Sequence, residues 1–182
     1  MAVGRQAPKG GLVDAATVLA MSDARSRIRS VSPEAWMRAA IEQARLGLAA
    51  GEVPVGAVAV LGGEIIARAF NCPIGAVDPT AHAEVLVLRA AARRLGNYRL
   101  TDVSVVVTIE PCLMCVGAMV HARVREVVYG AAEPKAGALV SAVRAAELPS
   151  LNHRLAVTGG VLEEECRAVL QEFFRARRGG EA

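Results

Sequence analysis

The sequence predicts an α/β fold, in which helices and strands alternate along the chain and pack as layers. Segments whose apolar residues recur with helical spacing alternate with short β-rich apolar runs. One of these runs, residues 103–107, is almost continuously apolar, which is typical of a strand buried on both faces of a sheet. The chain has 182 residues, of which 53% are hydrophobic, so it can form the core of one domain.

The first predicted helix begins at Ser32 and ends at Gly51. Ser32 suits the N-cap, Pro33 the first helical position, and the acidic Glu34 the first turn. Glycine commonly ends a helix, which places the C-terminus at Gly51. We expect the apolar side of this helix to consist of Trp36, Ala39, Ala40, Ala44, Leu46 and Ala50.

Two β-rich runs follow, residues 55–61 and 64–70, and the Gly62-Gly63 pair between them predicts a hairpin. The rest of the chain continues the alternation of helix and strand, without an internal repeat or a linker. Its predicted elements are a helix from Thr80 to about Gly96, the buried strand 103–107, a helix from Pro111 to about His121, strands over 125–129 and 154–158, and a helix over 161–178.

Composition and charge exclude several classes of protein. No stretch contains the roughly 18 uninterrupted apolar residues of a membrane-spanning helix. Aromatic residues make up only 3% of the chain, which argues against an RNA-binding platform of many stacking rings. The five basic and two acidic side chains of residues 1–30 account for the whole formal net charge of +3, so the remainder is balanced. A nucleic-acid surface would therefore be a local patch.

We expect residues 1–30 to be a disordered or non-native extension and residues 31–182 to form the single domain. The apolar piece at residues 11–21 is broken by Asp14 and followed by basic residues, which is the wrong order for a signal peptide. Without such a leader, a C-x-x-C pair indicates metal or redox chemistry in a reducing compartment. We therefore expect a cytoplasmic protein.

Four residues in two short motifs carry the predicted chemistry. His82-Ala83-Glu84 and Pro111-Cys112-Leu113-Met114-Cys115 each lie at a predicted helix start. Cys112 and Cys115 are three residues apart, so both sulfurs can point the same way. The positive end of a helix dipole stabilises thiolates. Two thiolates and one neutral imidazole are a common ligand set for Zn²⁺.

Charge arithmetic indicates the role of Glu84. Two thiolates and a neutral His82 around Zn²⁺ give a net charge of zero and leave a fourth position for water, whose pKa falls on zinc. A carboxylate beside that position can transfer a proton from the water to the leaving nitrogen of a substrate. The H-x-E…P-C-x-x-C arrangement is the signature of zinc nucleobase deaminases, which favours this reading.

Other interpretations of the same residues remain open. The two cysteines alone would suit a redox pair or small buried residues on an apolar helix. A closed structural zinc site would need a fourth ligand, for which the remaining candidates are Cys72, Cys166, His121 and His153.

With these motifs the sequence resembles the bacterial tRNA-specific adenosine deaminases, which convert the wobble adenosine of an anticodon to inosine. The resemblance extends from about residue 33 to 178. It implies a three-layer α/β/α sandwich with a five-stranded mixed sheet, as in cytidine deaminases, and a homodimer that binds a tRNA anticodon stem-loop. The matching stretches are residues 52–57, 71–75, 78–84, 97–100, 110–115, 117–123, 151–153 and 173–175.

The resemblance also implies roles for single residues. His82, Cys112 and Cys115 would bind one Zn²⁺ per chain, and Glu84 would transfer protons while zinc-activated water attacks C6 of the flipped adenine. The residues it implies for substrate binding are Asn71 at the flipped nucleotide, Val53 in the base pocket, the Ala83 backbone N–H at the purine, Glu133, Lys135 and Asn152 near the flanking nucleotides, and Arg175, Arg177 and Arg178 near the anticodon backbone.

Two departures from the family pattern leave the zinc chemistry untouched. Glu133 stands where we expect Asp, so a ribose contact and the selection of the flanking base could change. Leu139-Val140 replaces a smaller, Gly-containing stretch. The resemblance favours hydrolytic deamination of the wobble adenosine, and two other functions fit the same motifs: deamination of a free base or nucleotide such as cytosine or guanine, and a non-catalytic RNA-binding subunit with a structural zinc.

Overall fold

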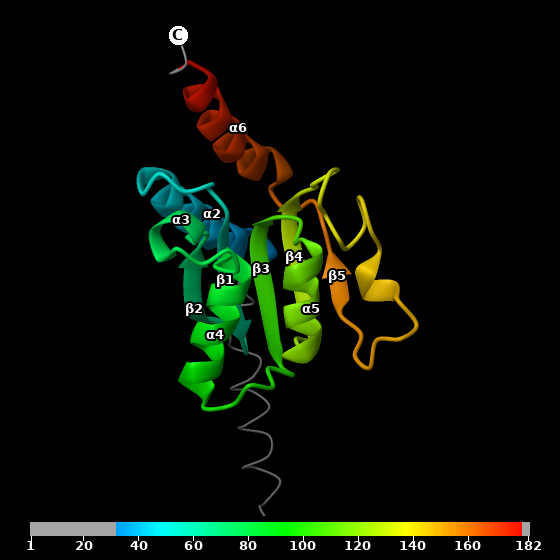
Figure 1. Cartoon of the computed structure of the whole chain (residues 1–182). Helices are drawn as coiled ribbons and strands as arrows, with labels where there is room; N and C mark the ends of the chain where they lie inside the picture. Colours follow the sequence, from blue (N-terminus) through cyan, green and yellow to red (C-terminus); the bar gives the residue numbers. More distant parts are fainter. Residues whose placement is uncertain (1–31, 180–182) are drawn as a thin grey trace, which may run out of the picture. The chain divides into compact units, whose positions relative to one another are not determined.

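A computed structural model describes residues 32–179 of the chain, so the expected extension over residues 1–30 lies outside the described part. The elements, drawn in Figure 1, are α2 (Pro33–Ala49), β1 (Gly56–Leu61), β2 (Glu64–Phe70), α3 (Pro73–Ala76), α4 (Ala83–Leu95), β3 (Val103–Ile109), α5 (Leu113–His121), β4 (Glu126–Ala131), the 3₁₀ turn η1 (Ala145–Glu147), β5 (Ala156–Thr158) and α6 (Glu163–Gly179).

The five strands form one mixed sheet in the order β2-β1-β3-β4-β5. Strand β1 is antiparallel to both β2 and β3, whereas β3, β4 and β5 run parallel. The hairpin that Gly62-Gly63 predicts joins β1 to β2, as expected. The predicted α/β fold with a five-stranded mixed sheet is therefore confirmed.

Helices cover both faces of the sheet, which makes three layers (Figure 1). Strand β3 is buried along its whole length, and its side chains alternate between the two faces. Val105 and Val107 pack in the core beneath α4 and α5, whereas Val106 packs in the core beneath α2 and α6. This double burial explains why the sequence of β3 is almost continuously apolar.

Two helices begin later than the sequence predicts, and the site depends on the difference. The helix expected from Thr80 begins at Ala83, because the backbone N–H and hydroxyl of Thr80 both donate to the Asp78 carboxylate in a turn. The helix expected from Pro111 begins at Leu113, after an extended residue. His82 and Cys112 are consequently the N-caps of α4 and α5 and have extended backbone.

The buried side of α2 also differs from the expected one. Leu46 and Ala50 were expected in the core but are exposed. The buried stripe instead includes Met37 and Ile41, with Ala40, Ala44 and Gly47 at the spacing of successive turns. Ala39, Ala40 and Ala44 are buried as expected, whereas Leu46 and Ala50 lie near the C-terminal end of α2 and remain exposed.

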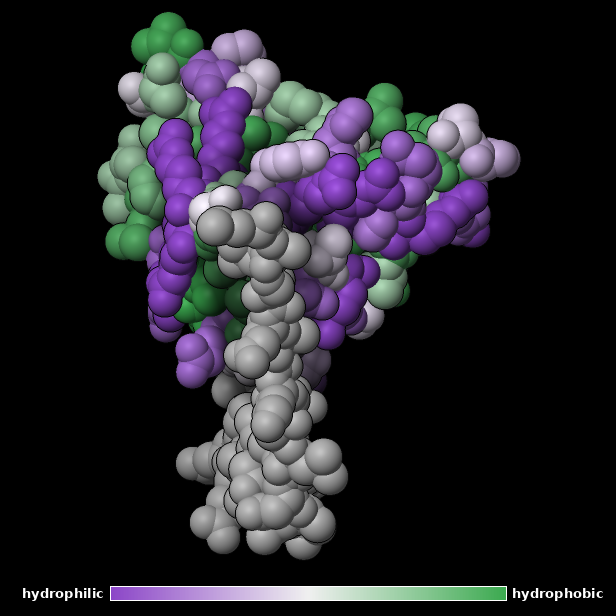
Figure 2. All heavy atoms as spheres, turned by 90° about the horizontal axis from the view of Figure 1, so that it is seen from below, coloured by the Kyte–Doolittle hydropathy of each residue, from purple (hydrophilic) through white to green (hydrophobic). Residues whose placement is uncertain are grey.

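Sequence periodicity did not predict α3 or η1, because each is a single turn. In residues 32–179, none of the helices has both the length and the apolarity needed to span a membrane. Seen from below in Figure 2, hydrophilic side chains cover much of the surface that grey atoms leave visible.

Candidate active site

Three possible metal ligands meet where two helices begin. His82 is the N-cap of α4, Cys112 is the N-cap of α5, and Cys115 lies in the first turn of α5. The Nδ1 atom of His82 lies 3.6 Å from the Sγ atom of each cysteine, and the two Sγ atoms lie 3.7 Å apart. Residues from two helices thus form one compact donor cluster.

The spacing of these donors fits a zinc ion. In a tetrahedral site, Zn²⁺ binds thiolate sulfur at about 2.3 Å and imidazole nitrogen at about 2.0–2.1 Å. Two such sulfurs are then about 3.8 Å apart, and a sulfur and a nitrogen about 3.6 Å apart. The observed separations of 3.7 Å and 3.6 Å agree with both values. The donor atoms present therefore suit three corners of one tetrahedral site.

The fourth ligands considered for a closed structural site lie elsewhere. Within residues 32–179, the only group of His, Cys, Asp and Glu that could hold a metal consists of His82, Cys112 and Cys115, with donor atoms within 4.8 Å of one another. His121 lines a groove between α4 and α5, and the Nε2 atom of His153 lies 2.6 Å from the Val124 carbonyl oxygen. Neither Cys72 nor Cys166 belongs to the group.

The two thiols of the cluster differ in acidity because they share a proton. A hydrogen bond from Cys115 lowers the pKa of Cys112 to about 5, although burial opposes this effect. The same hydrogen bond, burial and the nearby Glu84 charge raise the pKa of Cys115. The pair therefore holds one proton, which a cation bound to both sulfurs would displace.

A cavity of about 140 Å³ adjoins the donor cluster, and two buried glutamates line it. Glu84, in the first turn of α4, is only 4% exposed, and burial raises its pKa. Glu110 is 3% exposed; burial also acts to raise its pKa, but hydrogen bonds from Ser141 and from backbone N–H groups outweigh it and lower the value to about 2. Opposite shifts in one pocket indicate that Glu84 can hold a proton and that Glu110 stays ionised. The cavity is lined by Val55, Asn71, His82, Glu84, Ile109, Glu110 and Cys112.

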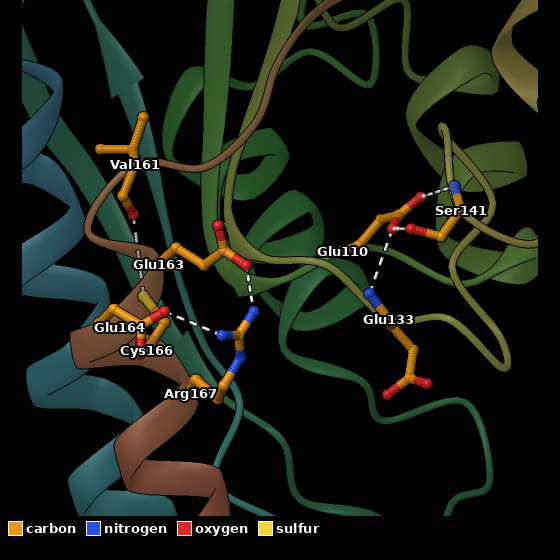
Figure 3. Close-up of polar contacts among 8 residues, drawn as sticks. All are labelled: Glu110, Glu133, Ser141, Val161, Glu163, Glu164, Cys166 and Arg167. Carbon is orange, nitrogen blue, oxygen red and sulfur yellow. Dashed lines mark hydrogen bonds and ion pairs between the residues drawn. The ribbon is translucent and has the colours of Figure 1, made fainter.

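Sequence reasoning assigned no role to Glu110, which immediately follows β3. Its Oε1 atom accepts hydrogen bonds from the backbone N–H groups of Leu139, Val140 and Ser141 at 3.1, 2.8 and 3.0 Å. Its Oε2 atom accepts from the Glu133 N–H at 3.2 Å and from the Ser141 hydroxyl (Figure 3). Five donors thus converge on one buried carboxylate.

Glu52, which also received no role, stabilises the other side of the pocket. It is 2% exposed, and its carboxylate accepts hydrogen bonds from the backbone N–H groups of Ile74 and Gly75 at 3.3 and 2.7 Å. These groups belong to α3, which follows the pocket residue Asn71. The only sequence signal for either glutamate is a carboxylate beside a buried apolar run, which must find hydrogen-bond donors if it is buried.

Of the residues expected to bind the substrate base, Asn71 lines the cavity and is 7% exposed. Val53 does not line it, whereas Val55, two residues further on, does. Ala83 is fully buried as the first residue of α4. The pocket wall next to the metal donors therefore includes the side chains of Asn71 and Val55.

The residues expected near flanking nucleotides lie in two places. Glu133 follows β4, and its Oε1 atom accepts a hydrogen bond of 3.0 Å from the N–H of the exposed Lys135. Asn152 is exposed before β5, and its carbonyl oxygen accepts a hydrogen bond from Arg123. Strands β4 and β5 are parallel, so Glu133 lies beyond the end of the sheet opposite to that of Asn152. The structure does not bring Asn152 together with the pocket residues.

The arginines expected near the anticodon backbone lie on the exposed part of α6. The Arg175 Nε donates to the Gln171 carbonyl oxygen at 3.4 Å, and the Arg177 guanidinium lies 4.6 Å from the centre of the Phe173 ring. Arg178 is exposed. Phe173 is 5% exposed and therefore belongs to the core, whereas Phe174 is 45% exposed.

Comparisons of the sequence with known proteins identify a deaminase family. Residues 31–178 match the family model of the MafB19-like deaminases. A tRNA-specific adenosine deaminase of Haemophilus influenzae is 45% identical over 154 residues, which cover 84% of this chain and 89% of the relative. A tRNA-specific adenosine deaminase of Bacillus subtilis is 46% identical over 145 residues, which cover 80% of this chain and 90% of the relative.

Solved structures show the same similarity. A structure from biochemical and structural studies of A-to-I editing by tRNA:A34 deaminases at the wobble position of transfer RNA matches with a TM-score of 0.72 and 42% identity, over 74% of this chain and 97% of that one. A guanine deaminase from Nitrosomonas europaea matches with a TM-score of 0.69 and 25% identity, over 94% of this chain and 98% of that one. Of these two, the tRNA-acting protein shares the larger fraction of identical residues.

Proposed function

The chain belongs to the MafB19-like deaminases and, within them, to the tRNA-specific adenosine deaminases, and from this membership we propose that it converts adenosine to inosine at the wobble position of a tRNA anticodon. The observation that carries the proposal is the cavity that joins a His/Cys/Cys donor cluster to a buried, protonatable Glu84. Hydrolytic deamination of a base needs both an activated water and a group that transfers protons.

We assign one Zn²⁺ per chain to His82, Cys112 and Cys115. When bound, zinc supplies Lewis-acid activation of water. The extended backbone of the two N-cap residues, His82 and Cys112, directs their side chains to one point. Their positions before the first turns of α4 and α5 also favour negatively charged sulfur.

We assign proton transfer to Glu84. The Glu84 carboxylate takes a proton from water and delivers it to the adenine ring nitrogen while the water oxygen bonds to C6. It then transfers the remaining proton of that oxygen to the exocyclic amine, the C6–N bond breaks, and ammonia leaves. Burial favours the protonated carboxyl, which is the form that delivers the proton. Glu110, in the same cavity, accepts five hydrogen bonds and remains ionised, so it does not compete for this role.

Asn71 is assigned to the flipped nucleotide, since its amide can donate and accept hydrogen bonds at once. The Ala83 N–H and Val53 are assigned to the base, although Val53 itself does not line the cavity. Glu133 and Lys135 are assigned to the flanking nucleotides, and so is Asn152, although it lies beyond the opposite end of the sheet. The exposed Arg175 and Arg178 are assigned to the anticodon backbone, where cations offset phosphate charge. The target is unpaired in an anticodon loop, so its extrusion costs less than from a duplex.

We also propose that the protein is a cytoplasmic homodimer. An apolar groove between α4 and α5, lined by Val85, Leu88, Tyr98 and Ala118 among others, supports a second copy as the occupant. Tyr98 is 68% exposed in a single chain, and tyrosine is enriched at protein interfaces. The metal-binding role of Cys112 and Cys115 requires reduced thiols, which fits the cytoplasm.

The test is to incubate the purified protein with an anticodon stem-loop that carries adenosine at the wobble position, and separately with free adenine, guanine and cytosine. We expect inosine in the stem-loop and no turnover of the free bases. The Glu84→Gln variant should keep its zinc and lose at least about a hundredfold in rate, the usual contribution of a general acid–base group. Deamination of guanine or cytosine with an unmodified stem-loop would instead support a free-base deaminase. Full activity of Glu84→Gln would contradict the assigned mechanism.

A further inference from the structure

Glu110 connects the reaction pocket to the loop that follows β4, residues 132–141. Glu110 follows β3 and lines the cavity with Glu84 and Cys112. Its carboxylate also accepts hydrogen bonds from both ends of the loop, at Glu133 on one side and at residues 139–141 on the other (Figure 3). One side chain thus contacts both the pocket and the loop.

Backbone contacts hold the middle of the same loop against the segment that carries the metal donors. Gly137 forms an isolated β-bridge with Cys112, and the Ala138 N–H donates to the Pro111 carbonyl oxygen at 2.8 Å. A Cβ on Gly137 would lie 2.5 Å from the Glu110 carboxyl carbon, so a side chain at this position would displace the carboxylate. The loop can approach Glu110 this closely only because residue 137 is glycine.

We propose that Glu110 is a positioning residue, which holds the loop of residues 132–141 at the rim of the pocket and thereby sets how strictly the nucleotides beside the reacting adenosine are selected. The inference rests on the proposed function, because it takes Glu133 and Lys135 as the residues that meet those nucleotides. Glu110 acts through the loop, because groups of the loop donate hydrogen bonds to both of its carboxylate oxygens.

The donor set explains why a carboxylate is required. Two oxygens with about four lone-pair sites can accept from several converging N–H groups, whereas an amide has one acceptor oxygen. In Glu110→Gln, the amide oxygen can still accept from residues 139–141, and the amide nitrogen can donate to the Ser141 hydroxyl. The Glu133 N–H then faces another donor and loses its partner. The variant therefore loosens the end of the loop that carries Glu133.

Amide hydrogen exchange tests the anchoring without relying on catalysis. In Glu110→Gln, we expect the amide of Glu133 to exchange at least about tenfold faster, since one charge-assisted hydrogen bond corresponds to a factor of that order. Amides in α4 and α5 should be unchanged, and zinc content should equal that of the wild type. Glu42→Gln is the matched control, because Glu42 is exposed on α2 and makes only a 3.8 Å ion pair with Arg68. Its loop amides should exchange as in the wild type.

Steady-state kinetics test the consequence for selectivity. We compare the cognate anticodon stem-loop with one in which a single flanking nucleotide is replaced. Glu110→Gln should raise KM for the cognate RNA about tenfold with kcat nearly unchanged, and should reduce the discrimination in kcat/KM between the two RNAs. Ser141→Ala removes one of the five donors. It should raise KM and reduce the discrimination in kcat/KM as Glu110→Gln does, but by less.

The outcomes separate this inference from the proposed function. Unchanged exchange in Glu110→Gln overturns the anchoring, whichever substrate the enzyme uses. Faster exchange with unchanged KM and unchanged discrimination overturns the role in selectivity, as would a loss confined to kcat. A wild-type enzyme that forms no inosine overturns the proposed function and the selectivity role together, while the exchange result still decides whether Glu110 anchors the loop.

Discussion

The Cys166 thiol occupies the space that a side chain on Gly130 would need. Gly130 belongs to β4 and Cys166 to the first turn of α6. A Cβ on Gly130 would collide with Cys166 Sγ and would lie 2.7 Å from the Thr108 carbonyl oxygen of the neighbouring strand. The absence of a side chain at residue 130 therefore determines how closely α6 packs on the sheet.

Replacing Gly130 with alanine should destabilise the protein. The added methyl must displace Cys166 or the β3 backbone, and overpacking of a well-filled core typically costs about 1–3 kcal/mol. Urea unfolding should show a lower free energy of unfolding for Gly130→Ala. In the double variant Gly130→Ala/Cys166→Ala, the unfolding free energy should fall by less than the sum of the two single losses. The second substitution removes the Cys166 sulfur, which is one of the atoms that the added methyl would meet. A Gly130→Ala protein as stable as the wild type would contradict the contact.

The same thiol should make the protein sensitive to alkaline pH. Burial, with a smaller effect of the Glu165 charge, raises the pKa of Cys166 to about 12. The unfolded chain ionises this thiol near its ordinary pKa of 9.0, whereas the folded protein does not. The contribution of the neutral Cys166 thiol to the free energy of unfolding is therefore fully present below about pH 9 and is lost as the pH rises toward 12. At about pH 10.5 the loss amounts to about 1–2 kcal/mol.

Urea unfolding of the wild type and of Cys166→Ala at two pH values, one near 8 and one near 10.5, measures this effect. The other three cysteines are present in both proteins, so the difference between the two slopes isolates Cys166. We expect the unfolding free energy of Cys166→Ala to fall less between the two pH values. Equal losses in both proteins would show that the Cys166 thiol ionises in the folded state as readily as in the unfolded one.

Much of the fold could be predicted from local sequence patterns. Gly62-Gly63 between two β-rich runs predicts the hairpin because glycine accommodates the tight turn, and both glycines have positive φ. The starts of α4 and α5 were predicted two to three residues too early, because Thr80 and Pro111 suit a helix start but make other hydrogen bonds: Thr80 donates to the Asp78 carboxylate, and the Pro111 carbonyl oxygen accepts from Ala138. One of these contacts lies in a neighbouring turn and the other reaches a distant loop, and hydrophobic periodicity predicts neither.

The residues of the candidate site likewise fall into those that a short motif predicts and those whose position depends on distant parts of the chain. The short motifs around His82 and Cys112 predict a donor cluster because a helix start holds each of them. The anchoring by Glu110 could not be predicted, since its donors lie 23 to 31 residues further along the chain. The position of Asn152 beyond the opposite end of β4 likewise depends on strand order, which one sequence does not reveal.

Replacing Cys112 with serine should remove the metal and lower stability together, because metal ligation contributes folding free energy. Elemental analysis of the wild type should give about one zinc per chain, and Cys112→Ser should give nearly none with a lower Tm. Cys72→Ser is the matched control, since Cys72 lies outside the donor group and should keep its zinc. Equal zinc content in the two variants would contradict the assigned ligands.

A leucine at Gly117 should disrupt the proposed homodimer without disrupting the fold. Gly117 lies in α5 one turn before His121, which lines the apolar groove, and apart from its own stretch of helix backbone a Cβ on Gly117 would meet no atom within 4 Å among residues 32–179. A glycine inside a helix costs about 1 kcal/mol relative to alanine, and a closely approaching partner backbone would explain its presence. Sedimentation velocity over a concentration series should show a dimer for the wild type and a weaker one for Gly117→Leu. Arg45→Leu, at an exposed position of α2, should dimerise like the wild type. A wild-type protein that remains monomeric at every concentration would contradict the homodimer, and a Gly117→Leu dimer of undiminished affinity would place the interface on another face.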